Sequence, residues 1–180
     1  MKSALAVLTL ALLASPTLAQ THAHGAANTQ SPYAGMTNRE IKALSNEQIT
    51  DLRAGRGMSL ALPAELNGYP GPGHALELAE QLDLTLAQHV ASQALFGEMK
   101  REATSLGGRI IESERALDTL FAARTVNSEN LNAATADAAA LQGQLRALHL
   151  KYHLHMRDVL TPTQVARYNE LRGYKKVNRP

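Results

Sequence analysis

Histidines carry the metal chemistry that this sequence offers. The chain has seven of them and no cysteine, so imidazole nitrogen and not thiolate would be the strong ligand for a transition metal. His149 and His153 are four residues apart in a segment with helical periodicity, which places both rings on one helix face. Met156 lies on the same flank, whereas His155 falls on the other side of the helix. Two imidazoles with a nearby thioether suit zinc, copper or nickel.

Two imidazoles leave a divalent ion undercoordinated, so further ligands would have to come from other segments. His74, Glu77 and Glu80 are candidates, because their short helix enters near the open end of the predicted long helices. Other candidates are His89, Glu98 and Met99. The alternative is that His149 and His153 are boundary histidines, packed or hydrogen-bonded at a helix edge. The sequence leaves both interpretations open.

A separate set of donors lies near the start of the chain, at His22 and His24. Cleavage after Ala19 would make His22 the third residue of the mature chain. A free amine, two amide nitrogens and that imidazole would then form a square-planar set for copper(II) or nickel(II). Cyclisation of Gln20 would remove the amine, and the alternative is that both are tail histidines without a role.

Motifs for catalysis are absent from the sequence. It contains no Gly-rich phosphate loop, no nucleophile elbow and no HExxH pattern. The formal charge is only +2 and there is no basic tract, so we expect no nucleic-acid partner. These features predict a binding protein that is not an enzyme and requires no cofactor, although zinc, copper or nickel remain possible ligands.

The first 19 residues have the pattern of a signal peptide. Lys2 precedes an apolar run from Ala4 to Ala14, Ser15-Pro16 breaks it, and Thr17-Leu18-Ala19 supplies small residues for cleavage. A run of about ten apolar residues is too short to span a bilayer, so we expect no stable membrane insertion. The sequence therefore predicts a periplasmic protein whose signal peptide is cleaved after Ala19.

Composition divides the remainder into four segments. We expect a disordered, His-containing lead over residues 20–37 and an N-terminal helical extension over 38–72. A hairpin domain follows over 73–174, and a tail over 175–180. Within the extension we expect a first helix from Asn38 to Ala54, a short apolar turn over 57–68, and a rigid kink at Tyr69-Pro-Gly-Pro-Gly73.

Two long helices and one short one are predicted in the hairpin domain. The short helix runs from His74 to Leu82, and the long ones from Thr85 to about Arg124 and from Ser128 to Leu160. Apolar residues in both long helices recur in alternating steps of three and four, which is typical of helices that pack side by side. The three-residue turn at 125–127 makes them antiparallel, with arms of roughly 50 Å. Gly107-Gly108 is expected to allow a bend.

This fold class is all-α: a long antiparallel helical hairpin with short flanking helices. A two-helix hairpin cannot enclose its own apolar stripe. The short helices look too small to line both arms, so we expect a second copy to cover the stripe in a homodimer.

One pattern occurs three times: a Leu, then Ser or Thr, two residues, and Gln. Its second copy opens the long helix from Thr85, and its third opens a terminal helix after Leu160. It is the pattern of a capping box, in which the hydroxyl and the Gln side chain each bind a backbone N–H of the first turn. The leucine can staple the entering chain to the core. The residues are Leu44, Ser45 and Gln48; Leu84, Thr85 and Gln88; and Leu160, Thr161 and Gln164.

The second and third of these motifs resemble the paired LTxxQ motifs of the Spy and CpxP periplasmic proteins. The resemblance covers about residues 73–174 and extends to the metal-responsive proteins ZraP and CnrX. It implies a homodimer shaped like a curved cradle. Chaperone members hold unfolded client proteins without ATP, whereas sensor members coordinate a transition metal and signal to a membrane-bound regulator. Met156 matches a Met of the CnrX-type proteins, but Tyr152 stands where their late His would be.

For a client chaperone we expect exposed apolar side chains mixed with positive charge. Arginines and lysines along both long helices supply the charge. The apolar side chains off the main stripes are Leu95, Phe96, Ile111, Phe121 and Leu154. For a metal sensor we expect convergent nitrogen or sulfur ligands near the open end of the hairpin.

Overall fold

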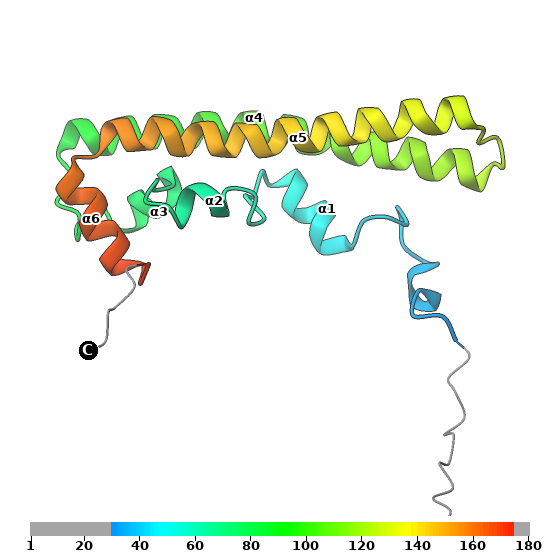
Figure 1. The fold of residues 1–180 in the computed structure, drawn as a ribbon, viewed down its shortest axis with the longest axis horizontal. Helices are drawn as coiled ribbons and strands as arrows, with labels where there is room; N and C mark the ends of the chain where they lie inside the picture. The colour runs from blue at the N-terminus through cyan, green and yellow to red at the C-terminus, as the bar shows by residue number, and fades with distance from the viewer. Residues whose placement is uncertain (1–29, 175–180) are drawn as a thin grey trace, which may run out of the picture. The chain divides into compact units, whose positions relative to one another are not determined.

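The computed structural model describes residues 30–174, and that part of the chain is helical throughout, without a β-strand. Figure 1 shows the elements in order. They are the 3-10 turn η1 (Ala34–Met36) and the α-helices α1 (Asn46–Arg53), α2 (Leu62–Glu65), α3 (Pro72–Glu77), α4 (Leu86–Ala122), α5 (Ser128–Val159) and α6 (Pro162–Leu171). The expected signal peptide, most of the lead, and the tail over 175–180 lie outside the described residues.

The chain divides into two compact units, residues 1–34 and 35–180. Of the first unit only residues 30–34 are described; there the backbone N–H of Ala34 donates to the carbonyl of Ser31. The second unit contains all six α-helices.

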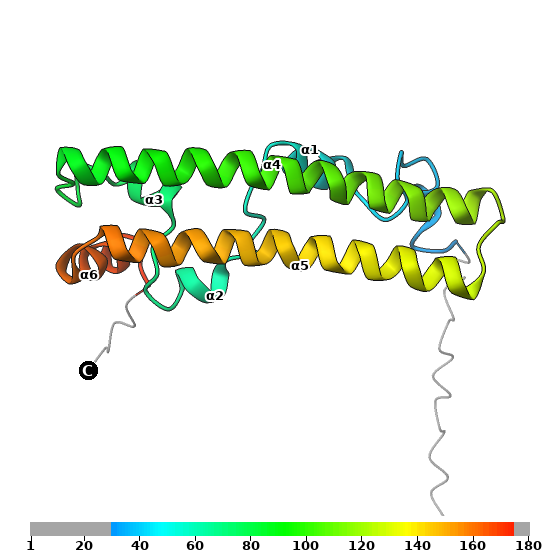
Figure 2. The ribbon, with the colours of Figure 1, turned by 90° about the horizontal axis from the view of Figure 1, so that it is seen from above.

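Helices α4 and α5 form the long antiparallel hairpin that the sequence predicts (Figure 2). They lie side by side over their whole length, joined by a short turn in which Asn127 caps α5. The Asn127 side chain accepts from the backbone N–H of Asn130, and the Asn130 side chain accepts from that of Asn127. The predicted all-α fold and helical hairpin are confirmed.

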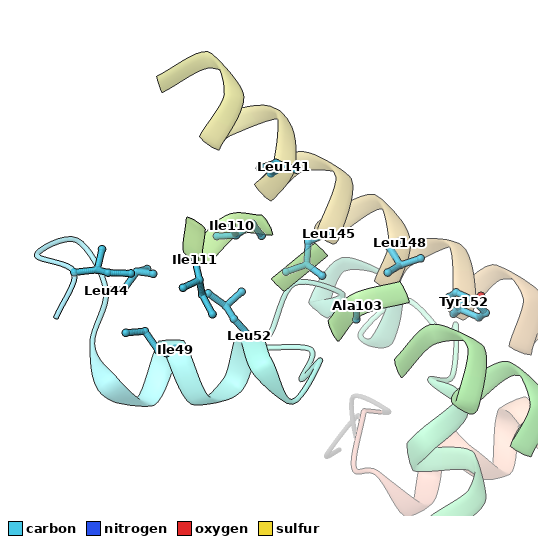
Figure 3. Packing of buried hydrophobic residues seen from close by; sticks show 11 residues of the cluster. Leu44, Ile49, Leu52, Ala103, Ile110, Ile111, Leu141, Leu145, Leu148 and Tyr152 are labelled. Carbon is cyan, nitrogen blue, oxygen red and sulfur yellow. The ribbon is translucent and has the colours of Figure 1, made fainter. Parts of the chain in front are cut away.

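The N-terminal extension covers one face of this hairpin (Figure 1). Helices α1 and α3 pack against α4, and α2 packs against α5. The main core cluster therefore joins both segments, as Figure 3 shows. Its buried members are Ile41, Leu44, Ile49, Leu52, Ala103, Ile110, Ile111, Leu141, Leu145, Leu148 and Tyr152. The premise that the short helices are too small to cover the apolar stripe was wrong for this stretch, because the loop before α1 contributes Ile41 and Leu44 as well.

Gly107 permits the close approach of α1 to α4. A Cβ at this position would lie 2.1 Å from the carbonyl oxygen of Leu52, which no side chain could tolerate. Gly108, by contrast, has nothing within 4 Å of the corresponding point. Helix α4 continues through both glycines as one element, and Gly107 serves the contact between α1 and α4.

Two of the predicted short helices have different bounds in the structure. The first begins at Asn46 and not at Asn38, because Ser45 is its N-cap and closes a capping box with Gln48. The next runs over Pro72–Glu77 and not from His74 to Leu82, since Pro72 supplies its first turn. The backbone then turns, and Asp83 takes a positive φ of 49° just before the cap of α4.

The two LTxxQ motifs are connected to each other. Each has a complete capping box, Thr85 with Gln88 at α4 and Thr161 with Gln164 at α6. The two glutamine amides also bind reciprocally, with Nε2 to Oε1 distances of 2.8 Å and 3.0 Å. Gln88 Nε2 donates to the carbonyl of Val159 as well. The motifs therefore fix the start of α4 to the junction of α5 and α6.

Leu84 and Leu160, the leucines of these two motifs, lie in a second apolar cluster. Leu160 is buried there with Ala75, Met156 and Val165, and Leu84 packs against the group. This cluster lies where α3 meets the open end of the hairpin. None of the helices in residues 30–174 has the length and apolar character that crossing a bilayer requires.

Candidate metal-binding cavity

A cavity of about 1080 Å³ opens between the extension and the hairpin. Its walls are the loop after α1, helix α2, the start of α3, and the facing sides of α4 and α5. The side chains that could bind a ligand there include His149, His153, Glu65, His74, Glu77, Met58 and Met99. Helix α5 places the two histidines on the wall because they are four residues apart.

His149 is buried, with 2% of its surface exposed, and its Nε2 has no hydrogen-bond partner among the described residues. Burial lowers the pKa of this ring, and the nearby His153 lowers it further. The ring is therefore neutral near pH 7. Because a buried polar atom without a partner costs free energy, on the order of 1–3 kcal/mol, this nitrogen calls for a ligand.

His153 is held in one orientation. Its Nδ1 lies 2.7 Å from the carbonyl oxygen of Tyr69 and must donate to it, so in the neutral ring Nε2 carries the lone pair. A Cβ at position 71 would lie 3.1 Å from this Nε2, so Gly71 leaves room for the ring. A histidine whose Nδ1–H is fixed by a carbonyl and whose Nε2 remains available is the usual arrangement of a metal-binding histidine.

Glu65 faces the same cavity from α2, and sequence reasoning did not single it out. Its Oε1 accepts from the hydroxyl of Tyr168, from that of Tyr174 at 3.0 Å, and from Nδ1 of His74 at 3.1 Å. Arg172 lies 3.8 Å away. Burial alone would raise the pKa of Glu65, but these hydrogen bonds and the charge of His74 outweigh it and lower the pKa to about 2. The carboxylate is thus ionised although only 5% exposed.

The second oxygen of this carboxylate, Oε2, is buried without a hydrogen-bond partner in the described part of the chain. It lies 3.6 Å from Nδ1 of His153. Glu65 therefore presents a negative oxygen with unused lone pairs next to one of the two histidines. The sequence signal for this residue was weak: an acidic residue inside the apolar stretch from Leu60 to Leu66.

The other predicted site residues lie at different places around the cavity. His74 lines it, and its Nε2 lies 3.4 Å from Arg172 Nη2. Glu77 lines it as an exposed side chain. Met156 is fully buried in the second apolar cluster and does not line the cavity. His155 is exposed, with its ring edge against Tyr152.

Among the alternative donors, Met99 lines the cavity, whereas Glu80, His89 and Glu98 do not. His22 and His24 lie outside the described residues. The structure thus brings His149, His153, His74 and Glu77 to one cavity and leaves Met156 out.

Within residues 30–174, no three His, Asp or Glu side chains are arranged to hold a metal ion as they stand. The donor chemistry nevertheless fits a transition metal. His149 Nε2 and Glu65 Oε2 are buried and unpartnered, and Nε2 of His153 carries a lone pair.

A family model described as heavy-metal resistance matches residues 57–167. This range begins in the loop before α2 and ends inside α6, so it includes His149, His153 and Glu65. It excludes α1 and the C-terminal residues that contact Glu65, namely Tyr168, Arg172 and Tyr174. No curated protein and no solved structure matches the chain.

Proposed function

Because the chain belongs to the heavy-metal resistance family, which contains the Spy- and CpxP-like and the ZraP- and CnrX-type proteins, we propose that it binds a transition-metal ion in this cavity. Zinc, copper and nickel are the candidate ions. The protein acts by binding, as a metal-responsive protein of the cell envelope, and performs no catalysis.

One observation carries this proposal. Two unpartnered buried atoms, His149 Nε2 and Glu65 Oε2, belong to residues that line the cavity, and so does the Nε2 of His153, which carries a lone pair. Buried polar groups without partners are rare in proteins, and a bound ion is one of the few explanations for them. Imidazole nitrogen and carboxylate oxygen are also the donors that borderline divalent metals prefer.

Each residue has a role in this proposal. His149 and His153 supply nitrogen lone pairs from adjacent turns of α5. Glu65 supplies negative charge from the opposite wall, and its hydrogen bonds from Tyr168 and Tyr174 hold the carboxylate in place. His74 and Glu77 lie at the same cavity and can complete the coordination.

Titration of the tag-free mature protein with zinc, copper and nickel tests the proposal. We expect binding at micromolar metal or tighter, and its loss in the double variant His149→Ala, His153→Ala. His155→Ala is the matched control, because His155 lies on the same helix but is exposed outside the cavity. Equal affinity in the double variant and the wild type would refute the site.

A second candidate function is that of an ATP-independent chaperone, which the exposed apolar side chains on the hairpin favour. Phe121 and Leu154 are each 54% exposed, and Leu86 and Val90 are more exposed still. Two residues expected on this surface do not belong to it: Ile111 is buried, and Leu95 packs against the core. Suppression of a model client's aggregation by the wild type, and its reduction in Phe121→Ser and Leu154→Ser, would support this function.

The assembly and location of the protein are part of the same proposal. We expect a homodimer, exported to the periplasm, whose partners are unfolded client proteins or a membrane-bound regulator. The alternative is a periplasmic heavy-metal sensor that signals to such a regulator. Light scattering coupled to size-exclusion chromatography will measure the molar mass. Cell fractionation, with sequencing of the mature N-terminus, will show whether cleavage follows Ala19.

A further inference from the structure

Two methionines line the same cavity as the two histidines. Met58 comes from the loop after α1 and Met99 from α4, on the facing wall. Both are half-buried, and both also pack against the main core cluster. The cavity therefore combines two thioether sulfurs with two imidazole rings, whereas Met156 lies in a different apolar cluster.

The backbone at Met58 adopts a conformation that a large side chain rarely takes. Its φ is +42°, and that of the next residue, Ser59, is +63°. Two successive non-glycine residues in the left-handed region are strained, and such conformations cluster at binding sites. This strained segment carries Met58 on the cavity wall.

Met58 also lies next in the chain to the residue that approaches His149. A Cβ at Gly57 would be 3.9 Å from both Cε1 and Nδ1 of the His149 ring. The loop thus passes directly against this imidazole and then turns, with the N–H of Leu60 donating to the Gly57 carbonyl at 2.7 Å. The strained segment and the unpartnered histidine belong to one part of the cavity.

Thioether sulfur is a soft, neutral ligand that zinc and nickel rarely take in proteins, whereas monovalent copper favours it. The chain has no cysteine, so methionine is its only source of soft sulfur. We propose that this cavity also binds Cu(I), with Met58 and Met99 as sulfur ligands beside His149. This inference rests on the proposed metal-binding function and names its ligand class.

Competition with a Cu(I) chelator of known affinity, under anaerobic conditions, tests this assignment. We expect Met58→Leu and Met99→Leu each to weaken Cu(I) binding at least about tenfold, because each removes one sulfur ligand. Leucine nearly conserves the volume of methionine, so the fold should be kept, and circular dichroism will check it. Met156→Leu is the matched control and should leave Cu(I) affinity unchanged.

Zn(II) titrations of the same variants separate a sulfur ligand from a packing residue. Zinc affinity should be unchanged in Met58→Leu and Met99→Leu, and lost in His149→Ala. X-ray absorption at the copper edge should show sulfur neighbours in the wild type and none in the double methionine variant.

Three results would count against the assignment. Cu(I) affinity unaltered by the methionine changes, or zinc affinity reduced by the same factor as copper affinity, would overturn it while leaving metal binding intact. Failure of the wild type to bind any of zinc, nickel or copper would instead refute the proposed function itself.

Discussion

The side chains of Gln88 and Gln164, 76 residues apart, hydrogen-bond to each other in both directions. Each amide oxygen also accepts from the N-cap N–H of its own helix, and each amide nitrogen also donates to a backbone carbonyl. Both amides are therefore fully used. The LTxxQ pattern serves here as a joint between two helix starts, in addition to capping each one.

Removing either glutamine should destabilise the protein through both roles. We expect Gln88→Ala and Gln164→Ala each to lower the free energy of unfolding by about 1–3 kcal/mol, because each breaks a cap and leaves polar atoms unpaired. Urea unfolding measures this loss. Gln48→Ala is the matched control: Gln48 closes the same kind of box at α1 without a partner in another motif, so its loss should be smaller. If the losses in the free energy of unfolding of the two single variants simply added in the double variant, the two side chains would not be coupled.

The two neighbouring glycines of α4 should respond oppositely to alanine. Gly107→Ala places a Cβ 2.1 Å from the Leu52 carbonyl, so α1 must move, at a cost of about 1–3 kcal/mol or more. Gly108→Ala meets nothing within 4 Å and should stabilise the helix by about 0.5–1 kcal/mol. Thermal unfolding of the two variants gives the comparison. A stabilised Gly107→Ala would show that α1 does not pack here.

The extension should behave as part of the hairpin's core. Leu52 of α1 is 5% exposed and lies in the main cluster, so Leu52→Ala should cost about 2–5 kcal/mol. Leu66, in the same extension, is 56% exposed, and Leu66→Ala should change stability by less than about 0.5 kcal/mol. Chemical unfolding monitored by circular dichroism measures both. Similar small effects would mean that the extension folds apart from the hairpin.

Glu65 should make the metal-free protein sensitive to acid. Its folded pKa of about 2 lies below the ordinary 4.5, so between these values the unfolded chain binds more protons. Its contribution to stability is present above pH 4.5 and is lost as the pH falls toward 2. The loss is on the order of 3 kcal/mol. Urea unfolding at a series of pH values should show a steeper decline for the wild type than for Glu65→Gln. Parallel curves for the two would refute the low pKa.

Local patterns were enough to predict the hairpin. Both signals are local in the sequence: the apolar steps of three and four, and the short turn before Ser128. The bounds of α4 and α5 agree closely with them. The predicted helix start at Asn38 was wrong, because the apolar spacing continues on the N-terminal side of Ser45. Ser45 is the N-cap, and the helix begins after it, at Asn46. Apolar spacing alone does not mark a helix start.

The cavity could be predicted only in part, because its walls come from distant segments. The i, i+4 spacing placed His149 and His153 together, but Glu65 depends on Tyr168, which is 103 residues away. Met156 shares a flank of α5 with the histidines, yet α3 covers it through Ala75. No periodicity within one helix shows which neighbour will cover a given side chain.

Because one carboxylate, Glu65, accepts hydrogen bonds from both Tyr168 and Tyr174, the C-terminal residues of the described chain support a residue of α2. Proteolytic trimming after Leu171 would take away Arg172 and Tyr174 and leave that anion with fewer donors inside a poorly hydrated interior. Loss of these C-terminal residues would therefore lower the stability of α2, which lies about a hundred residues earlier in the chain.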